Sequence, residues 1–95
     1  MSYQVLISEE VEQFLKDQDD KTERIVKNQL RNLEKHPYPG KGKGDKEKLP
    51  IKGKTRYRLH IGRTWTAYYT IKKENKEVKV LDILPIDKAH KEYGH

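Results

Sequence analysis

The residues best suited to chemistry in this chain are basic side chains that alternate with apolar ones in the run TRYRLHI, residues 55–61. Successive side chains of a β-strand point to opposite faces, so Arg56, Arg58 and His60 are predicted to share one face. Arginine binds phosphate oxygens through several N–H donors, and histidine exchanges a proton near neutral pH. We therefore interpret this face as a site for a polyanion. RNA is the favoured candidate, and cross-strand pairing of the arginines is the alternative.

The positive charge of the chain is concentrated just before and within that run. Residues 41–58 contain eight basic and two acidic residues, and the rest of the chain has 13 of each sign, so this segment carries the whole net charge of +6. A concentrated positive surplus favours an anionic partner. The alternative is a solvated, lysine-rich loop that aids solubility. Lys48, Lys52 and Lys54 lie closest to the alternating run and extend the predicted site.

An aromatic strand, residues 64–72, is predicted to follow through a two-residue turn at Gly62 and Arg63. In that register His60 faces Trp65, which places the indole on the basic face. Nucleic-acid-binding proteins combine cations that bind phosphates with aromatic rings on which bases stack. The alternative assigns Trp65 and the tyrosines of this strand to the core.

Several classes of site are excluded by composition. The chain has no cysteine, so disulfides and thiolate metal sites are absent, and its four histidines are too scattered to predict a metal site. The run GKGKGDKEK lacks the strand–loop–helix setting and the GKS/T ending of a phosphate-binding loop. No apolar run approaches the roughly 20 residues of a membrane span. Glu9 and Glu10 interrupt any N-terminal signal sequence. These observations predict a cytoplasmic protein with no membrane, metal or other cofactor requirement.

Hydrophobic periodicity predicts two amphipathic helices among four strands. Ser8 is the expected N-cap of the first helix, and Asp20 with Glu23 resembles a capping box on the second. The predicted ranges are 3–7, 55–61, 64–72 and 78–84 for the strands, 9–18 and 20–36 for the helices, 37–54 for a basic loop and 86–95 for a C-terminal tail. The β-α-α-β-β-β order in one domain, residues 1–95, predicts an α+β fold. In it a helical hairpin packs on one face of an antiparallel sheet.

Over nearly its whole length the chain resembles the RelE/ParE superfamily of toxins from type II toxin–antitoxin systems. The resemblance rests on the order of elements, on the run KLPIKGKTRYRLHIGRTWTAYY and on the closing LDILPIDKAHKEY. It implies a RelE-like fold and a cognate antitoxin that holds the toxin inactive. RelE-like members cleave mRNA in the decoding site of the ribosome without a metal ion, whereas ParE-like members inhibit DNA gyrase.

The resemblance also implies which residues form the site. In RelE-like members, cations on the second strand act in catalysis and phosphate stabilisation, and residues of the tail complete the site. The implied catalytic residues are Lys54, Arg56, Arg58, Lys88 and Tyr93. The RNA-binding residues expected around them are Lys48, Lys52, His60, Arg63, Trp65 and His90. Arginine does not act as an ordinary base, so proton transfer is left to Lys54, His60, His90 or Tyr93.

Two positions depart from the family pattern. Trp65 stands where the second hairpin strand of the family carries Arg, and Lys88 replaces an Arg of the tail. Lysine keeps the charge but loses the bidentate phosphate geometry of arginine. RelE-like mRNA cleavage is therefore the leading hypothesis. A ParE-like gyrase inhibitor and a catalytically weakened RNA-binding homologue are the alternatives.

Overall fold

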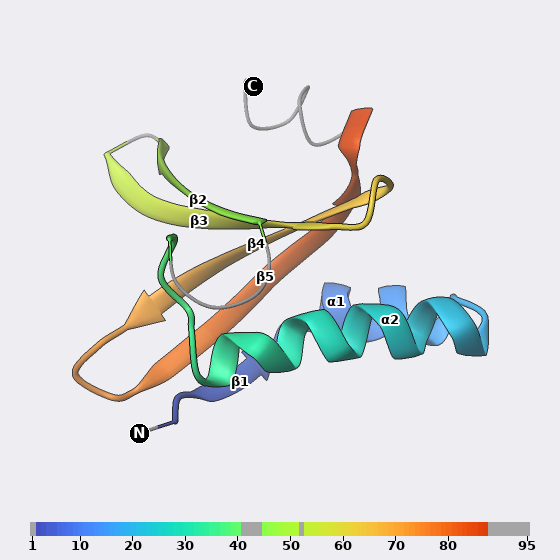
Figure 1. The fold of residues 1–95 in the computed structure, drawn as a ribbon, viewed down its shortest axis with the longest axis horizontal. Coiled ribbons are helices and arrows are strands. Elements are labelled where there is room, and N and C mark those ends of the chain that lie inside the picture. Colours follow the sequence, from blue (N-terminus) through green and yellow to red (C-terminus); the bar gives the residue numbers. More distant parts are fainter. Residues whose placement is uncertain (1, 41–44, 52, 88–95) are drawn as a thin grey trace.

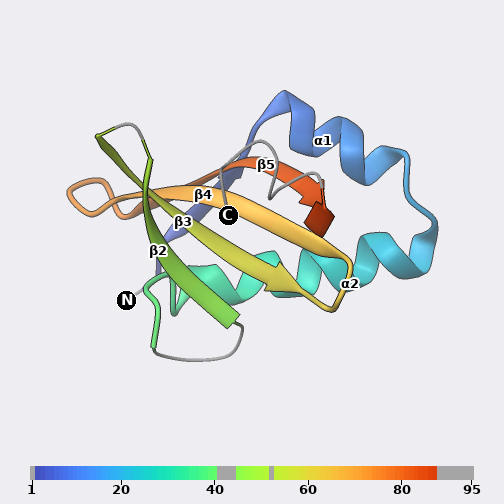
Figure 2. The ribbon, with the colours of Figure 1, turned by 90° about the horizontal axis from the view of Figure 1, so that it is seen from above.

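The computed structural model describes residues 2–40, 45–51 and 53–87, without the side chains of Asp45 and Ile51. Two helices cover one face of a twisted five-stranded sheet (Figure 1), and Figure 2 shows the same arrangement from above. In chain order the elements are β1 (Gln4–Ile7), α1 (Glu9–Lys16), α2 (Asp20–Arg31), the 3-10 helix η1 (Asn32–Glu34), β2 (Asp45–Ile51), β3 (Lys54–Ile61), β4 (Trp65–Lys72) and β5 (Glu77–Pro85). The predicted α+β fold, with a helical hairpin on one face of a sheet, is confirmed.

Helix α1 begins at its predicted N-cap. The Ser8 hydroxyl accepts a hydrogen bond from the Val11 backbone N–H at 3.2 Å and donates one to the Leu81 carbonyl at 2.8 Å. One hydroxyl therefore satisfies a free N–H of the first turn and ties the start of α1 to β5.

Helix α2 begins one residue earlier than the predicted capping box. Its N-cap is Asp19, whose carboxylate accepts from the Thr22 N–H at 2.7 Å, so the assignment of Asp20 as the cap is wrong. The helix also ends at Arg31, and η1 replaces the last turn that was expected to reach His36. Within the described parts of the chain, neither helix is long and apolar enough to cross a membrane.

The sheet is mixed, with the strand order β1-β5-β4-β3-β2. The outer strand β1 lies parallel to β5, with Val5 beside Val78, and the other neighbouring pairs are antiparallel. The expected antiparallel sheet is therefore antiparallel only from β5 to β2. A parallel neighbour needs a long crossover connection, which the helical hairpin and the strands that follow it provide.

Strand β2 occupies much of the segment that was predicted to be a loop over residues 37–54. The prediction is wrong for residues 45–51, which pair antiparallel with β3 along their whole length. The sequence DKEKLPI contains few of the residues enriched in strands, so its local pattern did not indicate one. As an edge strand, β2 tolerates Pro50, because its outer side makes no ladder hydrogen bonds.

The β3–β4 hairpin has a three-residue connection, residues 62–64, where two residues were predicted. The extra residue shifts the register by one, so Trp65 faces Ile61, not His60. Gly62 has a φ of +61°, a backbone conformation that glycine adopts without strain. Because a shift of one residue moves every side chain to the other face, the predicted location of Trp65 on the basic face is wrong.

The main core lies between the helices and the sheet. It contains Val11, Leu15, Val26, Leu30 and Leu33 from the helical part and Tyr57, Leu59, Ile61, Ala67, Tyr69, Val78, Val80 and Ile83 from the sheet. A smaller buried cluster, formed by Leu49, Tyr68 and Leu84, lies on the opposite face. The face of the sheet opposite the helices therefore has an apolar floor of its own.

Candidate nucleic-acid interface

The face of the sheet turned away from the helices carries the basic residues of β3, and we call it the arginine face. Tyr57, Leu59 and Ile61 are buried toward the helices, as the alternating pattern predicted. The period of two therefore places Lys54, Arg56, Arg58 and His60 on the arginine face. Lys54 is exposed and the other three are half-buried, so all four can be reached from solvent. Alternate residues of a strand are about 6.6–6.8 Å apart, so four basic side chains form a row along β3.

Arg58 is held in place by Glu47 of the neighbouring strand. The two residues are directly opposite each other in the β2–β3 ladder, and the Arg58 Nε–H donates to Glu47 Oε2 at 3.0 Å. The Nη2 group of the same guanidinium also contacts Oε2. The side chain of Arg58 is only 14% exposed, whereas that of Glu47 is 53% exposed. These two bonds use two of the five guanidinium N–H groups and leave three that can bind a phosphate.

Sequence reasoning missed Glu47 because its strand was not predicted. Cross-strand pairing, the alternative interpretation of the two arginines, therefore applies to Arg58, which has a carboxylate partner. Once β2 is paired with β3, the alternation of Lys46, Glu47 and Lys48 sends the carboxylate to one face and both lysines to the other. The arginine face is thus less uniformly positive than the composition of residues 41–58 suggested.

A buried tyrosine lies next to Arg58 on β4. Tyr68 is directly opposite Arg58 and, on its other side, opposite Asp82 of β5. Its ring is fully buried with Leu49 and Leu84, and the half-buried Asp82 accepts a hydrogen bond from the Ile83 N–H at 3.1 Å. Arg58 therefore lies between the carboxylate of Glu47 on β2 and the buried ring of Tyr68 on β4.

Arg56 lies closer than Arg58 to the N-terminal end of β3. One of its Nη groups is 3.5 Å from the carbonyl of Thr55, and it is directly opposite Leu49. That long contact to its own neighbour competes weakly with a phosphate, because N–H···O hydrogen bonds are usually about 2.7–3.2 Å long. Arg56 is therefore more available to a polyanion than Arg58.

Two predicted RNA-binding residues lie away from this face, and a third is at its end. Trp65 packs on the helix side, where its ring meets Phe14 edge to face with centroids 4.8 Å apart. Lys48 is opposite Tyr57 and therefore also belongs to the helix side of β2. Arg63 is exposed in the β3–β4 turn. Their roles in RNA binding stay predictions, but the structure does not bring them together with Arg56 and Arg58.

Four further predicted site residues, Lys52, Lys88, His90 and Tyr93, are outside the described residues. Their assignments stay predictions. Over residues 2–40, 45–51 and 53–87, no group of three or more His, Asp and Glu side chains could hold a metal ion.

On the helix side, two buried polar groups anchor the segment after η1 to the sheet. The Tyr69 hydroxyl donates to the Pro37 carbonyl at 2.7 Å, and Lys46 Nζ donates to the His36 carbonyl at the same distance. Burial raises the pKa of Tyr69, with a smaller contribution from Tyr57. Burial also lowers the pKa of Lys46. Lys46 is in β2 and Tyr69 is in β4, the two strands beside β3. These hydrogen bonds therefore help to fix the sheet that carries the arginine face.

The chain matches a family model over residues 5–89, that of the ParE toxin of the type II toxin–antitoxin system parDE. No curated protein sequence matches it.

Solved structures of toxins are similar to the whole fold. In the archaeal RelE–RelB complex from Pyrococcus horikoshii, a chain with 28% identity superposes with a TM-score of 0.74, covering 90% of this chain and 96% of that one. The YoeB dimer of Staphylococcus aureus has 18% identity, a TM-score of 0.65 and coverages of 86% and 94%. The intact E. coli RelBE toxin–antitoxin complex has 14% identity, a TM-score of 0.58 and the same coverages. The latter two show a shared fold alone.

Proposed function

Since the chain belongs to the ParE toxin family of type II toxin–antitoxin systems, we propose that it is a RelE-like toxin that cleaves mRNA on the ribosome and is neutralised by an antitoxin. The observation that carries the proposal is the row of Lys54, Arg56, Arg58 and His60 along the arginine face. The 28% identity to an archaeal RelE chain supports the RelE-like assignment.

Binding is the first step that this row supports. Phosphate contacts from lysine and arginine supply most of the sequence-independent affinity for nucleic acid. Arg56 is free to clamp one phosphate, and the three unused donors of Arg58 can bind the next. The spacing of about 6.6–6.8 Å between alternate residues suits consecutive phosphates of an extended strand. An mRNA lying along β3 is therefore the substrate geometry that we propose.

The chemistry that we propose is attack of a ribose 2′-OH on the adjacent phosphorus. The 2′-oxygen forms a bond to phosphorus, the bond to the 5′-oxygen breaks, and the products are a 2′,3′-cyclic phosphate and a 5′-OH. His60 accepts the proton of the 2′-OH, because histidine is the side chain best suited to proton transfer near neutral pH. Arg58 stabilises the negative charge that develops on the phosphorane, a task for which a fixed guanidinium is well suited.

The remaining roles fall to residues outside the described part of the chain. The leaving 5′-oxygen needs a proton, which Tyr93 or His90 would donate. Lys88 would add a further cation at the phosphate. Because the basic side chains supply the positive charge, the proposed reaction requires no metal or other cofactor. Its partners are mRNA and the ribosome in the cytoplasm, together with an antitoxin.

A ParE-like activity against DNA gyrase is the second candidate. The family model that matches the chain carries the ParE name. In addition, Glu47 accepts hydrogen bonds from two N–H groups of Arg58, which leaves fewer donors for a phosphate and weakens the case for a strong phosphate site. A binding protein on the same fold that does not cleave RNA would have these features.

The two candidates are separated by two assays on the purified chain. We expect it to cut mRNA on programmed ribosomes and to leave DNA supercoiling by gyrase unchanged. Arg58→Ala slows cutting by about a hundredfold to a thousandfold, whereas Arg31→Ala, which replaces an exposed arginine of α2, does not alter it. Inhibition of supercoiling with intact mRNA would contradict the proposal and select the gyrase candidate.

A further inference from the structure

A pocket opens on the arginine face where β4, β5 and β1 lie side by side. Its volume is about 170 Å³. Five residues line it, namely Leu6 of β1, Thr70 and Lys72 of β4, and Glu77 and Lys79 of β5. Val78 and Val80, which flank Lys79 in β5, are buried in the main core, so the lysine projects from the opposite face. Pockets for drug-sized molecules are usually larger, roughly 300–1,000 Å³, so this one is suited to a group of the size of one nucleobase.

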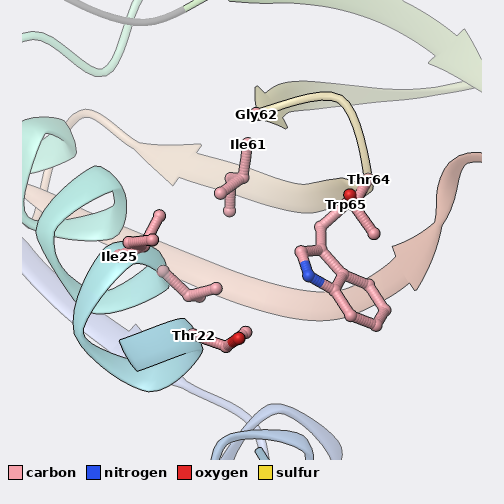
Figure 3. Close-up of a pocket in the computed structure, with 7 residues that line it drawn as sticks. Thr22, Ile25, Ile61, Gly62, Thr64 and Trp65 are labelled. Atoms are coloured by element: carbon pink, nitrogen blue, oxygen red, sulfur yellow. The ribbon is translucent and has the colours of Figure 1, made fainter. Parts of the chain in front are cut away.

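Another pocket, of about 190 Å³, opens on the helix side between α2 and the β3–β4 turn. Figure 3 shows Ile25, Ile61 and Trp65 among the residues around it, together with the hydroxyl groups of Thr22 and Thr64. None of the described residues that line it is charged, and a threonine hydroxyl both donates and accepts. The pocket on the arginine face differs, because an ammonium group only donates and a carboxylate only accepts. Its lining can therefore select a ligand by its hydrogen-bond pattern.

The pocket on the arginine face continues the row of basic residues on β3. Tyr57 of β3 pairs with Tyr69 of β4, so Arg56 and Thr70 are the next residues of those two strands. Thr70 in turn pairs with Lys79 of β5. Neighbouring strands are about 4.7–4.9 Å apart, so β5 is about 9–10 Å from the strand that carries Arg56. A nucleotide whose phosphate is bound by Arg56 can therefore place its base over β5.

The charged groups of this pocket are one acceptor with a donor on each of two sides. Glu77 is directly opposite Lys72 in the β4–β5 ladder. Lys79 is two residues further along β5, at a spacing of about 6.6–6.8 Å, and points to the same face. In the part of the chain that the structure describes, Glu77 forms no ion pair with either lysine. All three groups are therefore available to a ligand, in the order donor, acceptor, donor.

Uracil is the RNA base whose Watson–Crick edge has the complementary order. Its N3–H donor lies between two acceptors, O4 and O2. Cytosine presents one donor and then two acceptors, guanine presents one acceptor and then two donors, and adenine offers only one donor and one acceptor. Proteins read the bases of a single RNA strand on this edge because it is not used for pairing. A pyrimidine is also the smaller kind of base, which suits the volume of the pocket.

We propose that this pocket is a specificity subsite that binds one uracil of the RNA. Glu77 accepts the hydrogen bond of N3–H, and Lys72 and Lys79 donate to O4 and O2. Leu6, which is 37% exposed, offers an apolar surface to the ring. That the RNA is an mRNA rests on the proposed function, whereas the choice of uracil rests on the pocket. Because the subsite is beside Arg56, it sets the register of the RNA on the arginine face.

The test measures RNA affinity without the ribosome, by fluorescence anisotropy on the full-length protein. The probes are labelled oligocytidine strands that differ at one central nucleotide, with 2′-O-methyl riboses that lack the attacking hydroxyl. We expect central uridine to bind about tenfold more tightly than central cytidine, because cytidine has no N3–H for the carboxylate. 5-Methyluridine keeps the Watson–Crick edge and should bind as uridine does. 3-Methyluridine lacks the N3–H and should lose the gain.

Two glutamate variants test whether the pocket makes the choice. Glu77→Ala should bring the affinities for uridine and cytidine strands within about twofold of each other. Glu74→Ala, which removes an exposed carboxylate from the β4–β5 turn, should keep the ratio at about tenfold. The ratio is the readout because the loss of any nearby negative charge raises the affinity for every RNA. Thermal melts show whether both variants fold.

Three results would overturn the inference: no binding of any strand, equal affinity for uridine and cytidine, or a preference for uridine that survives Glu77→Ala. Cleavage of mRNA on programmed ribosomes separates the inference from the proposed function. If the wild type prefers uridine and leaves mRNA intact, the proposed function fails and the subsite stands. If the wild type cuts mRNA and binds the strands equally, the subsite fails and the proposed function stands.

Discussion

Replacing Glu47 with Gln should lower the stability of the protein and raise its affinity for RNA. The carboxylate contacts Arg58 across the β2–β3 ladder and is about half exposed. Exposed ion pairs contribute roughly 0.2–1 kcal/mol, and the low exposure of Arg58 puts this pair at the upper end, about 0.5–1 kcal/mol. For a domain of this size the midpoint of thermal unfolding should fall by about 3–6 °C.

The change in RNA affinity has the opposite sign. Glu47 shares a guanidinium with the phosphate that Arg58 is proposed to bind. For two negative charges about 5 Å apart at the dielectric constant of water, the repulsion is about 0.8 kcal/mol. Removing it should tighten binding by about fourfold, and the freed donors of Arg58 should strengthen the same contact.

Two assays on the same preparation measure both effects. Thermal unfolding by circular dichroism gives the stability, and fluorescence anisotropy with a labelled single-stranded RNA gives the affinity at several salt concentrations. A parallel loss of stability and affinity would refute the reasoning, because Glu47 would then support the RNA site structurally and not compete with the phosphate. A fall in the cleavage rate by about a hundredfold at unchanged RNA affinity would instead show that Glu47 takes part in catalysis, either by positioning Arg58 or as the acceptor of the proton in place of His60.

Three further predictions concern the scaffold, and chemical denaturation at controlled pH measures each of them. Ser8→Ala should cost about 1–2 kcal/mol, because it removes the N-cap of α1 and its link to β5. Tyr69→Phe should cost about 1–3 kcal/mol by leaving the Pro37 carbonyl without its donor. Because the folded-state pKa of Tyr69 is raised, its contribution is complete below about pH 10 and is lost at higher pH, so the variant should show a smaller alkaline loss of stability. Hydrogen bonds from Thr22 lower the pKa of Asp19, so its contribution is present above about pH 4 and is lost in acid. Asp19→Asn should therefore flatten the acid side of the stability profile, and an unchanged acid side would contradict this.

The helices and β3 were predictable because local chemistry determines them. The Ser8 hydroxyl marks the start of α1, and the alternation of Tyr57, Leu59 and Ile61 with basic residues fixes which face of β3 is buried. Both signals depend on neighbours within a few residues, and tertiary contacts do not oppose them. The row of basic residues on β3 followed directly from the same alternation.

Neither the register of the β3–β4 hairpin nor the presence of β2 could be predicted from neighbouring residues alone. Whether the β3–β4 turn has two or three residues depends on the glycine conformation at Gly62, and that choice decides which face receives Trp65. Strand β2 forms because β3 offers it an unpaired edge, not because DKEKLPI favours a strand. The contact between Glu47 and Arg58 depends on that pairing, and so it appeared only in the folded structure.

Mapping of mRNA 5′ ends after incubation with programmed ribosomes tests directly whether the arginine face cuts RNA. We expect the wild type to cut within the codon of the decoding site. Arg58→Ala should be slower by about a hundredfold to a thousandfold, and Arg58→Lys should recover only part of the rate. Intact mRNA with the wild type, or cutting by Arg58→Ala at the wild-type rate, would contradict the claim.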